Sequence, residues 1–559
     1  MKCLCISDFN IEVLQRTLKN HIPEPRVDAI CAPYGQVLEL ILNSDADCWK
    51  WGCEMAIVWT RPQAIIPSFT RLLNFEKVSI DSILDEVDQY ASHLVSILGK
   101  VKAVVIPTWI MSYRERGLGV IDMTHSQGIG HALMHMNLRL VERLQEHKSI
   151  YVIDTHKWLA EGGKDSYTNC FWYMTKAPFS LGVYLEAVYD IKALVSAIRG
   201  ESKKLLVMDL DDTIWGGIVG DVGWRDLRLG GHDPIGEAFV DFQMAIKNLS
   251  KRGVILGIVS KNEEGVALEA IRNHPEMILK ETDFVGWRIN WNEKATNIKE
   301  LAKELNLGLQ SVVFLDDSPI EREWVRTSLP EVFVPEMPKD KMLYKQTLTE
   351  LHCFDTIAIS EEDEQRSKMY TVDRQRKELS KEVVSADDFL KSMDVKIKVD
   401  PLLQENLLRT AQLLNKTNQM NLSTRRMTEQ ELWGWAQKPE NKIWTIRVND
   451  KFGDSGLVGV VSMRTDGEIV DFILSCRVFG RKIEETMVWL LVDYARTVGI
   501  KTIQAKYVKT DKNKPTLSFF ERSGLKPENE TCFNWDTAIQ YPLSELITIE
   551  YENNLSAKL

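Results

Sequence analysis

The sequence has no long hydrophobic run. Within its 559 residues, no apolar stretch approaches the roughly 20 residues that a membrane-spanning helix requires. The longest candidates, such as VKAVVIPTWIM at residues 101–111, have the length and composition of buried strands. The opening MKCLCISDFN also lacks the apolar segment and cleavage site of a secretory signal. We therefore expect a cytoplasmic protein without a membrane partner.

A cysteine pattern and an excess of basic residues are also missing. The nine cysteines are an odd number and show no CxxC or Cys/His spacing, which favours reduced thiols over a disulfide framework or a zinc site. Lysine and arginine number 69 against 80 acidic residues, a net charge of −11. Because the phosphate backbone calls for a basic face, this balance argues against nucleic acid as the main partner.

The length predicts three or four domains, and the patterning suggests where they lie. Residues 1–195 alternate short apolar strands with amphipathic helices, which is typical of an α/β layer on a parallel sheet. Residues 200–345 form a second such unit. Residues 346–392 are dense in charge and predict an exposed helical connector. Residues 393–550 predict an α+β domain with an antiparallel core, so the fold class is multidomain α/β.

Three acids end an apolar run in the stretch LLVMDLDDTIWGGIVGDVG, residues 205–223. Asp209 and Asp211 flank one leucine where the chain leaves the predicted strand, and like charges this close require a cation or a proton. Mg²⁺ suits them best, because it prefers carboxylate and phosphate oxygens. We assign Asp212, which follows them, no chemistry. The glycines beyond it allow the chain to turn tightly beside the site.

Later polar residues fit the same cavity. Ser260 ends the apolar run GVILGIVS, and Asn262 follows it. Lys294 begins a predicted helix, where its ammonium could neutralise a phosphoryl group. The run SVVFL is followed by Asp316 and Asp317, a second acidic pair. All of them stand at the carboxyl ends of predicted strands or just beyond, where an open parallel sheet binds its ligands.

These motifs, in this order, resemble the four motifs of the haloacid dehalogenase (HAD) superfamily. The wider text DLDDTIWGGIVGDVG, VSKNEEGV and VVFLDDSPIERE resembles the FkbH-like family, a HAD subclass (IIIC) of polyketide biosynthesis. The resemblance implies a nucleophile that also binds Mg²⁺, a general acid/base whose backbone carbonyl binds Mg²⁺, phosphoryl-binding residues and further Mg²⁺ ligands. The nucleophile is Asp209 and the general acid/base is Asp211. The phosphoryl-binding residues are Ser260, Asn262 and Lys294, with Thr213 as loop support. The further Mg²⁺ ligands are Asp316 and Asp317.

The carboxy-terminal text resembles the GNAT acyltransferase fold. NKPTLSFFERSGL is similar to its closing helix, and RVFGRKIEE to its pyrophosphate loop, where Arg477 and Gly480 match. Lys482 stands where a small residue is expected, which argues against ordinary acetyl-CoA binding but leaves room for the pantetheine of a carrier protein. Cys476 lies beside this loop and is either an acyl acceptor or a buried strand cysteine. The polar segment 415–426 either lines the acyl site or caps a helix.

The amino-terminal domain occupies the place of an SGNH hydrolase-like domain in longer FkbH-like proteins. The expected Gly-Asp-Ser order is absent, because Ser7 precedes Asp8. The Asp-x-x-His motif is also absent, with only Asp154 and His156 in its place. We therefore expect no working Ser/His pair here. A structural or carrier-docking role is the better interpretation.

The resemblance implies a glyceryl transferase/phosphatase. Such an enzyme takes a glyceryl unit from 1,3-bisphosphoglycerate, removes phosphate and loads the unit as a thioester on the phosphopantetheine of an acyl carrier protein. Two alternatives stay open: a small-molecule phosphatase with scaffolding flanking domains, and a non-catalytic docking protein of a biosynthetic assembly line.

Overall fold

The computed structural model describes residues 1–551 except 23, 44, 126, 359–390, 392, 452, 476–477 and 511. The chain divides into two compact units, Met1–Ser196 and Ala197–Leu559. Most of the predicted connector, and the predicted site residues Cys476 and Arg477, lie outside the described residues. Among the described helices, none has the length and apolar character needed to cross a bilayer.

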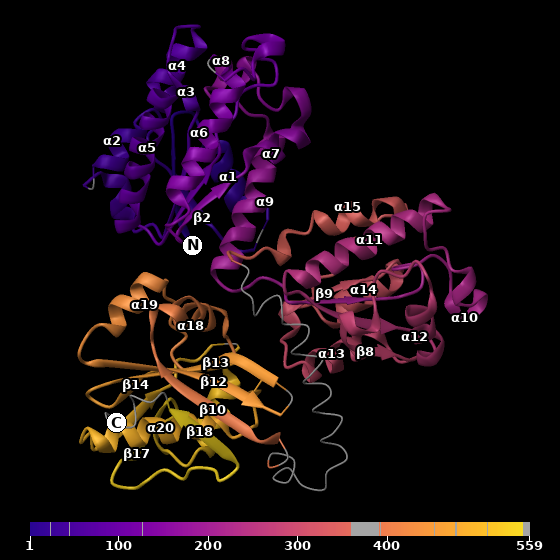
Figure 1. Cartoon of the computed structure of the whole chain (residues 1–559), viewed down its shortest axis with the longest axis vertical. Helices are drawn as coiled ribbons and strands as arrows, with labels where there is room; N and C mark the ends of the chain where they lie inside the picture. Colours follow the sequence, from indigo (N-terminus) through magenta and orange to yellow (C-terminus); the bar gives the residue numbers. More distant parts are fainter. Residues whose placement is uncertain are drawn as a thin grey trace. The chain divides into compact units, whose positions relative to one another are not determined.

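The first unit is a parallel five-stranded sheet in the order β2-β1-β3-β4-β5. Its strands are β1 (Lys2–Ser7), β2 (Asp28–Cys31), β3 (Met55–Trp59), β4 (Ala103–Pro107) and β5 (Ile150–Ile153). Its helices are α1 (Glu12–Asn20), α2 (Val37–Leu42), α3 (Pro62–Ile65), α4 (Pro67–Leu73), α5 (Ile80–Ser96), α6 (Ile129–Leu144), α7 (Thr155–Gly162), α8 (Asn169–Thr175) and α9 (Leu181–Ile198) (Figure 1). Alternate strand residues such as Leu4 and Val58 pack against α5 and α6.

The second unit begins with a parallel four-stranded sheet in the order β8-β7-β6-β9. Its strands are β6 (Leu205–Met208), β7 (Ile255–Ser260), β8 (Phe284–Ile289) and β9 (Val312–Leu315). Its helices are α10 (Val219–Val222), α11 (Pro234–Lys251), α12 (Glu264–Asn273), α13 (Lys294–Glu304), α14 (Pro319–Ser328) and α15 (Tyr344–Thr349). Leu206 and Met208 face α11 and α12, whereas Leu205 and Val207 face α13 and α14. The sheet is therefore covered on both faces, as a parallel sheet requires.

The rest of the second unit is built on a nine-stranded mixed sheet in the order β16-β17-β15-β14-β13-β12-β10-β18, with β11 beside β14. The strands are β10 (Val395–Pro401), β11 (Met420–Asn421), β12 (Asn441–Asp450), β13 (Gly453–Arg464), β14 (Glu468–Leu474), β15 (Thr502–Lys506), β16 (Lys526–Asn529), β17 (Cys532–Asp536) and β18 (Ile547–Tyr551). The helices are α18 (Gln404–Lys416), α19 (Glu429–Ala436), α20 (Ile483–Thr497) and α21 (Lys514–Arg522). Helices α20 and α21 cover one face, and α18 and α19 the other.

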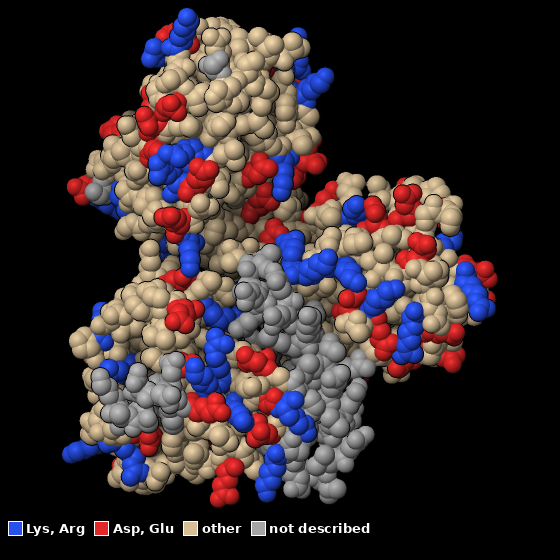
Figure 2. Space-filling model, in the orientation of Figure 1, with Lys and Arg blue, Asp and Glu red and all other residues tan. Residues whose placement is uncertain are grey.

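The predicted multidomain α/β class is confirmed, with two parallel sheets and a carboxy-terminal α+β part. The carboxy-terminal sheet is mostly antiparallel as expected, but β14 pairs with β15 and β10 with β18 in parallel. β10 and β18 are distant in the sequence, so local patterning does not reveal their pairing. β14 and β15 are consecutive strands joined through α20, the kind of connection that a parallel pair requires. The exact domain boundaries stay predictions. On the face seen in Figure 2, acidic and basic side chains are interspersed over the described parts.

Candidate active site

Acids from two strands and one lysine meet at the carboxyl edge of the HAD-like sheet. Asp209 directly follows β6, Asp316 follows β9, and Lys294 opens α13. The ammonium Nζ of Lys294 lies 2.9 Å from Asp209 Oδ2 and 2.6 Å from Asp316 Oδ2. All three side chains are buried. The parallel strand order places them here, since β6 and β9 are neighbours that end at the same edge.

Three carboxylates at this edge fit a hard divalent cation. Asp209, Asp316 and Asp317 each offer one oxygen, and these atoms all lie within 4.8 Å of one another. Asp209 Oδ1 is buried and has no hydrogen-bond partner among the described residues. An orphaned, buried carboxylate oxygen is costly unless a ligand satisfies it. The donor set is all oxygen, which Mg²⁺ prefers.

Burial shifts the ionisation of these groups. It raises the pKa of Asp316 to about 7, with the negative charge of Asp209 adding to the effect. The pKa of Asp317 is also raised, chiefly by burial. Burial acts to lower the pKa of Lys294, but the carboxylates of Asp209 and Asp316 outweigh it and hold that pKa above its ordinary value. Lys294 therefore stays charged and offsets part of the acidic cluster.

Three donors hold the carboxylate of Asp211. Trp215 Nε1 donates to its Oδ1 at 2.8 Å, and the Val219 N–H to the same oxygen at 3.0 Å. The Asn262 side-chain amide donates to Oδ2 at 2.8 Å. Burial nevertheless raises the pKa of Asp211, which suits a group that must carry a proton to a leaving group. Asn262, predicted to bind phosphate, is thus placed beside the predicted general acid.

Two smaller predicted residues are buried in the same region. The hydroxyl of Thr213 accepts a hydrogen bond from the Asp317 N–H at 3.1 Å, which joins the loop after β6 to the loop after β9. Ser260 ends β7 and is 2% exposed. The structure therefore places the residues that the HAD motifs single out at the carboxyl edge of one sheet.

Lys341 is a member of the site that the sequence did not reveal. Its Nζ donates to the backbone carbonyl of Asp212 at 2.6 Å and to the hydroxyl of Tyr344 at 2.8 Å, and lies 3.4 Å from Asp317 Oδ2. Asp212 has φ 53°, and its Oδ1 accepts the Gly217 N–H at 3.0 Å. Asp212 thus shapes the loop after β6. No motif marked Lys341, because it lies 129 residues from Asp212 in the sequence.

The site residues predicted in the carboxy-terminal part are described only in part. Gly480 has φ 73°, a conformation that favours glycine, and its N–H donates to Glu484 Oε1 at 3.1 Å. Lys482 precedes α20 with φ 63°. In segment 415–426, Asn415 donates to the Met427 carbonyl at 2.8 Å, and Asn421 to that of Thr417 at 3.0 Å. These bonds fasten the chain at the end of α18, which favours the helix-cap interpretation.

The first unit keeps its serine and histidine in local contacts. Ser7 is 1% exposed, and its hydroxyl accepts the Phe9 N–H at 3.2 Å. His156 Nδ1 lies 3.2 Å from Asp154 Oδ1 of its own turn, with a side chain 55% exposed. Neither geometry is that of an activated nucleophile with its base.

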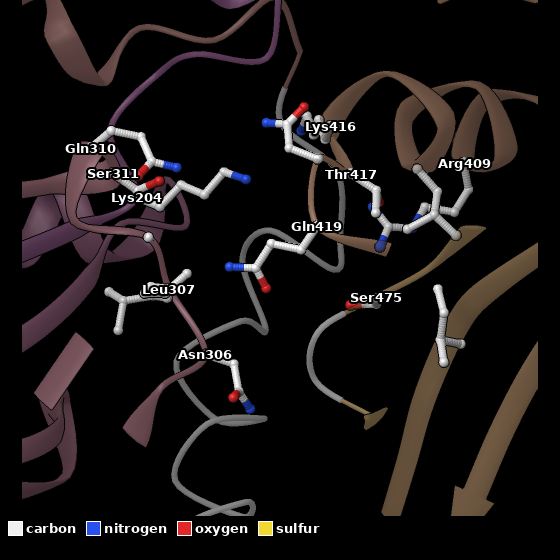
Figure 3. A pocket seen from close by; sticks show the side chains of 15 residues that line it. Lys204, Asn306, Leu307, Gln310, Ser311, Arg409, Lys416, Thr417, Gln419 and Ser475 are labelled. Atoms are coloured by element: carbon white, nitrogen blue, oxygen red, sulfur yellow. The ribbon is translucent and has the colours of Figure 1, made fainter. Parts of the chain in front are cut away.

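A pocket within the second unit lies at the other edge of the HAD-like sheet (Figure 3). Lys204 and Ser311 directly precede β6 and β9, so these residues mark the amino ends of those strands. Arg409 and Lys416 of α18 line the same pocket. Asp209 and Asp316 stand at the carboxyl ends of these strands, so this pocket is separate from the candidate active site.

Comparison with solved structures gives a neighbour that matches much of this chain. It is the N-terminal part of protein BF1531 from Bacteroides fragilis, which contains a phosphatase domain and was solved in complex with Mg. The match has 28% identity and a TM-score of 0.58, and covers 64% of this chain and 94% of that one. This chain is similar to a phosphatase-containing protein. No family model and no curated protein matches the sequence.

Two weaker matches each cover about a quarter of the chain. One is a putative acetyltransferase of the GNAT family from Desulfovibrio desulfuricans, at 14% identity, with a TM-score of 0.20, covering 25% of this chain and 99% of that one. Another is a domain from Methanocaldococcus jannaschii, at 19% identity and a TM-score of 0.21, covering 26% and 99%.

Proposed function

We propose that this chain is a Mg²⁺-dependent glyceryl transferase/phosphatase that removes phosphate from a 1,3-bisphosphoglycerate-derived unit and loads glyceryl on an acyl carrier protein. The observation that carries the phosphatase half is the buried set of Asp209, Asp316, Asp317 and Lys294 at one sheet edge. The similarity to a Mg-complexed phosphatase region supports it. The proposed loading of glyceryl on an acyl carrier protein rests on the resemblance of the motifs to the FkbH-like family.

Each residue then has a chemical task. A carboxylate oxygen of Asp209 attacks phosphorus, the bond to the leaving oxygen breaks, and an aspartyl-phosphate forms. Asp211 gives its proton to the leaving oxygen and then takes one from the water that releases inorganic phosphate. Lys294 offsets charge on the transferring group. A bound Mg²⁺, held by Asp209, Asp316 and Asp317, would supply further charge neutralisation and orient the phosphoryl oxygens.

The acyl step is ordinary thioester formation. A thiolate attacks the acyl carbon of the acyl phosphate, and inorganic phosphate leaves as the carbon–sulfur bond forms. The thiol is that of the carrier's phosphopantetheine, either directly or after transfer through Cys476. Arg477 and Gly480 of the predicted loop are proposed to bind the pantetheine arm.

The test incubates the protein with Mg²⁺, 1,3-bisphosphoglycerate and a phosphopantetheinylated carrier, and then weighs the carrier. We expect the mass gain of one glyceryl group, together with phosphate release. Asp209→Asn should lower phosphate release by about 10³-fold or more, whereas Asp221→Asn, an exposed acid on α10, should leave it unchanged. Unchanged release in Asp209→Asn would exclude Asp209 as the nucleophile.

The alternative is a small-molecule phosphatase with scaffolding flanking domains. It predicts phosphate release that is independent of the carrier, no mass gain on any cognate carrier, and no effect of Cys476→Ala. Absence of both Mg²⁺ binding and phosphate release would favour a docking protein instead.

A further inference from the structure

The strand order of the first unit places a ligand-binding edge away from the phosphatase chemistry. In the order β2-β1-β3-β4-β5, β2 is added on one side of β1, and β3, β4 and β5 are added in turn on its other side. Ligands of open parallel sheets bind at the carboxyl edge where the order reverses, here between β1 and β3. Asp8 follows β1 directly, and Arg61 stands two residues beyond β3. These two residues therefore occupy the switch point.

Arg61 is held in a fixed orientation there. Its Nε donates to Asp8 Oδ2 at 2.7 Å, and its backbone N–H to Asp8 Oδ1 at 2.8 Å. The side chains of Arg61 and Asp8 are 17% and 7% exposed. The ring of Trp172 on α8 covers the guanidinium, with 3.6 Å between Arg61 Cζ and the ring centroid. Figure 1 shows α3, which Arg61 precedes, and α8 at the same end of this unit.

The terminal amino groups of Arg61 remain available. Among the described residues, neither Nη1 nor Nη2 has a hydrogen-bond partner within reach. A guanidinium oriented through Nε and stacked on an aromatic ring presents those groups as a rigid fork, which matches the oxygens of a carboxylate or phosphate. The carboxylate of Asp8 already balances the positive charge of Arg61. Selection of a ligand therefore rests on hydrogen bonds from Nη1 and Nη2 more than on net charge.

Two further groups point to a ligand at this edge. Gln63, two residues after Arg61, has a buried Oε1 with no hydrogen-bond partner in the described part of the chain, and such an acceptor suits a hydroxyl group. The ammonium of Lys176 lies 5.2 Å from the centroid of the Trp172 ring and adds positive charge. The serine of the edge, Ser7, is 1% exposed and bonded locally, so binding fits this edge better than hydrolysis.

We propose that the β1/β3 edge of Met1–Ser196 binds a small hydroxylated molecule through its carboxylate or phosphate group, with Arg61 as the anion-binding residue. The inference rests on the geometry of the first unit and is independent of the function proposed for the phosphatase site.

The test uses the full chain labelled with 5-fluorotryptophan, in the Asp209→Asn background so that no phosphate ester is consumed. Comparison with Trp172→Phe assigns the ¹⁹F resonance of Trp172. The probes are D-glycerate, glycerol 3-phosphate and inorganic phosphate. We expect saturable movement of the Trp172 resonance with at least one probe. A response to glycerate alone identifies a carboxylate ligand, and a response to the phosphate probes identifies a phosphate ligand.

Arg61→Lys keeps the charge but removes the fork, and should weaken the effective probe by about tenfold or more. Arg71→Lys is the control, because Arg71 forms an exposed ion pair with Glu76 in the same unit. Near-ultraviolet circular dichroism verifies that both variants are folded. If Arg61→Lys does not fold, Arg61→Gln takes its place under the same criterion. A Trp172 resonance that none of the probes moves at millimolar concentration, or equal affinity in the folded Arg61 variant, would overturn the proposal.

Discussion

Lys294 places one buried ammonium between the buried carboxylates of Asp209 and Asp316. Removing one partner of a buried ionic set leaves the others uncompensated, at a cost of about 3–5 kcal/mol. We therefore expect Lys294→Met to lower the free energy of unfolding by about that amount in a chelated buffer. The loss should be smaller at low pH, because Asp316, whose pKa burial raises to about 7, then takes up a proton.

Urea unfolding at pH 8 and at pH 6 measures this effect. Lys299→Met on the exposed face of the same helix is the control, and it should change stability by less than about 0.5 kcal/mol. Equal losses in the two variants would show that the ammonium of Lys294 does not stabilise the acidic set.

His274 gives a second effect at the residue scale. It is buried, and burial lowers its pKa, so the folded state favours the neutral ring. Its stabilising contribution is complete above the ordinary histidine pKa of about 6.5 and is lost as the pH falls through the lower folded value. We expect the part of the chain around the β8-β7-β6-β9 sheet to lose stability between pH 7 and pH 5, and His274→Asn to flatten that dependence.

Thermal unfolding across this pH range tests the expectation. His232→Asn, at an exposed position in the same region, is the matched control and should keep the wild-type slope. A slope equal to wild type in His274→Asn would assign the acid sensitivity to other groups.

Residues that follow strands were the predictable part of the site. Asp209, Ser260 and Asp316 could be placed from sequence, because each ends or follows an apolar run and parallel strands align their carboxyl ends. The position of Lys341 could not be predicted, because it depends on how the chain returns after α14 to the loop at Asp212. The hydrogen bond from Asn262 to Asp211 was missed for a related reason: spacing does not show where a side chain points.

At the scale of elements, one acid joins two helices of the first unit. Asp88 on α5 accepts paired hydrogen bonds from Arg139 and Arg143 on α6, with Nε to Oδ1 distances of 2.8 Å in each case. Arg143 and Arg139 hold the pKa of Asp88 well below its usual range. The 3.6-residue periodicity predicted both helices, but this contact between them depends on tertiary packing.

We expect Asp88→Asn to lower the melting temperature of the first unit by about 2–4 °C. The partners are partly exposed, so the difference from wild type should shrink in high salt. It should also begin to shrink as the pH falls below about 4 and be lost only as the pH falls through the lowered pKa of folded Asp88, where the carboxylate takes up its proton. Calorimetry at two salt concentrations checks this, with Asp85→Asn on the same helix as control. A difference that is independent of salt would contradict an ionic origin.

The pairing order of strands was less predictable than the strands themselves. Runs such as KIWTIRVND and SGLVGVVSMRT correspond to the antiparallel neighbours β12 and β13, which a short connection favours. The parallel partner of β10 is β18, nearly 150 residues away, and local patterning contains no information on that choice. The same applies to the switch point between β1 and β3, which becomes visible only once the sheet order is known.

At the scale of the whole molecule, separate hydrophobic cores predict separate unfolding. The core that includes Leu4 and Val87 belongs to Met1–Ser196, whereas those that include Phe239 and Leu491 belong to Ala197–Leu559. Units with their own cores unfold as separate cooperative transitions. We therefore expect Asp88→Asn to move one calorimetric transition of the full chain and Lys294→Met to move another.

The double variant makes this expectation quantitative. Because Asp88 and Lys294 share no partner, their effects should add within about 0.5 kcal/mol, and each transition of the double variant should coincide with that of the corresponding single variant. The pair Asp85→Asn and Lys299→Met, combined in one chain, should leave both transitions in place. A single transition that either substitution shifts by the same amount would mean that the two units, Met1–Ser196 and Ala197–Leu559, unfold as one cooperative unit.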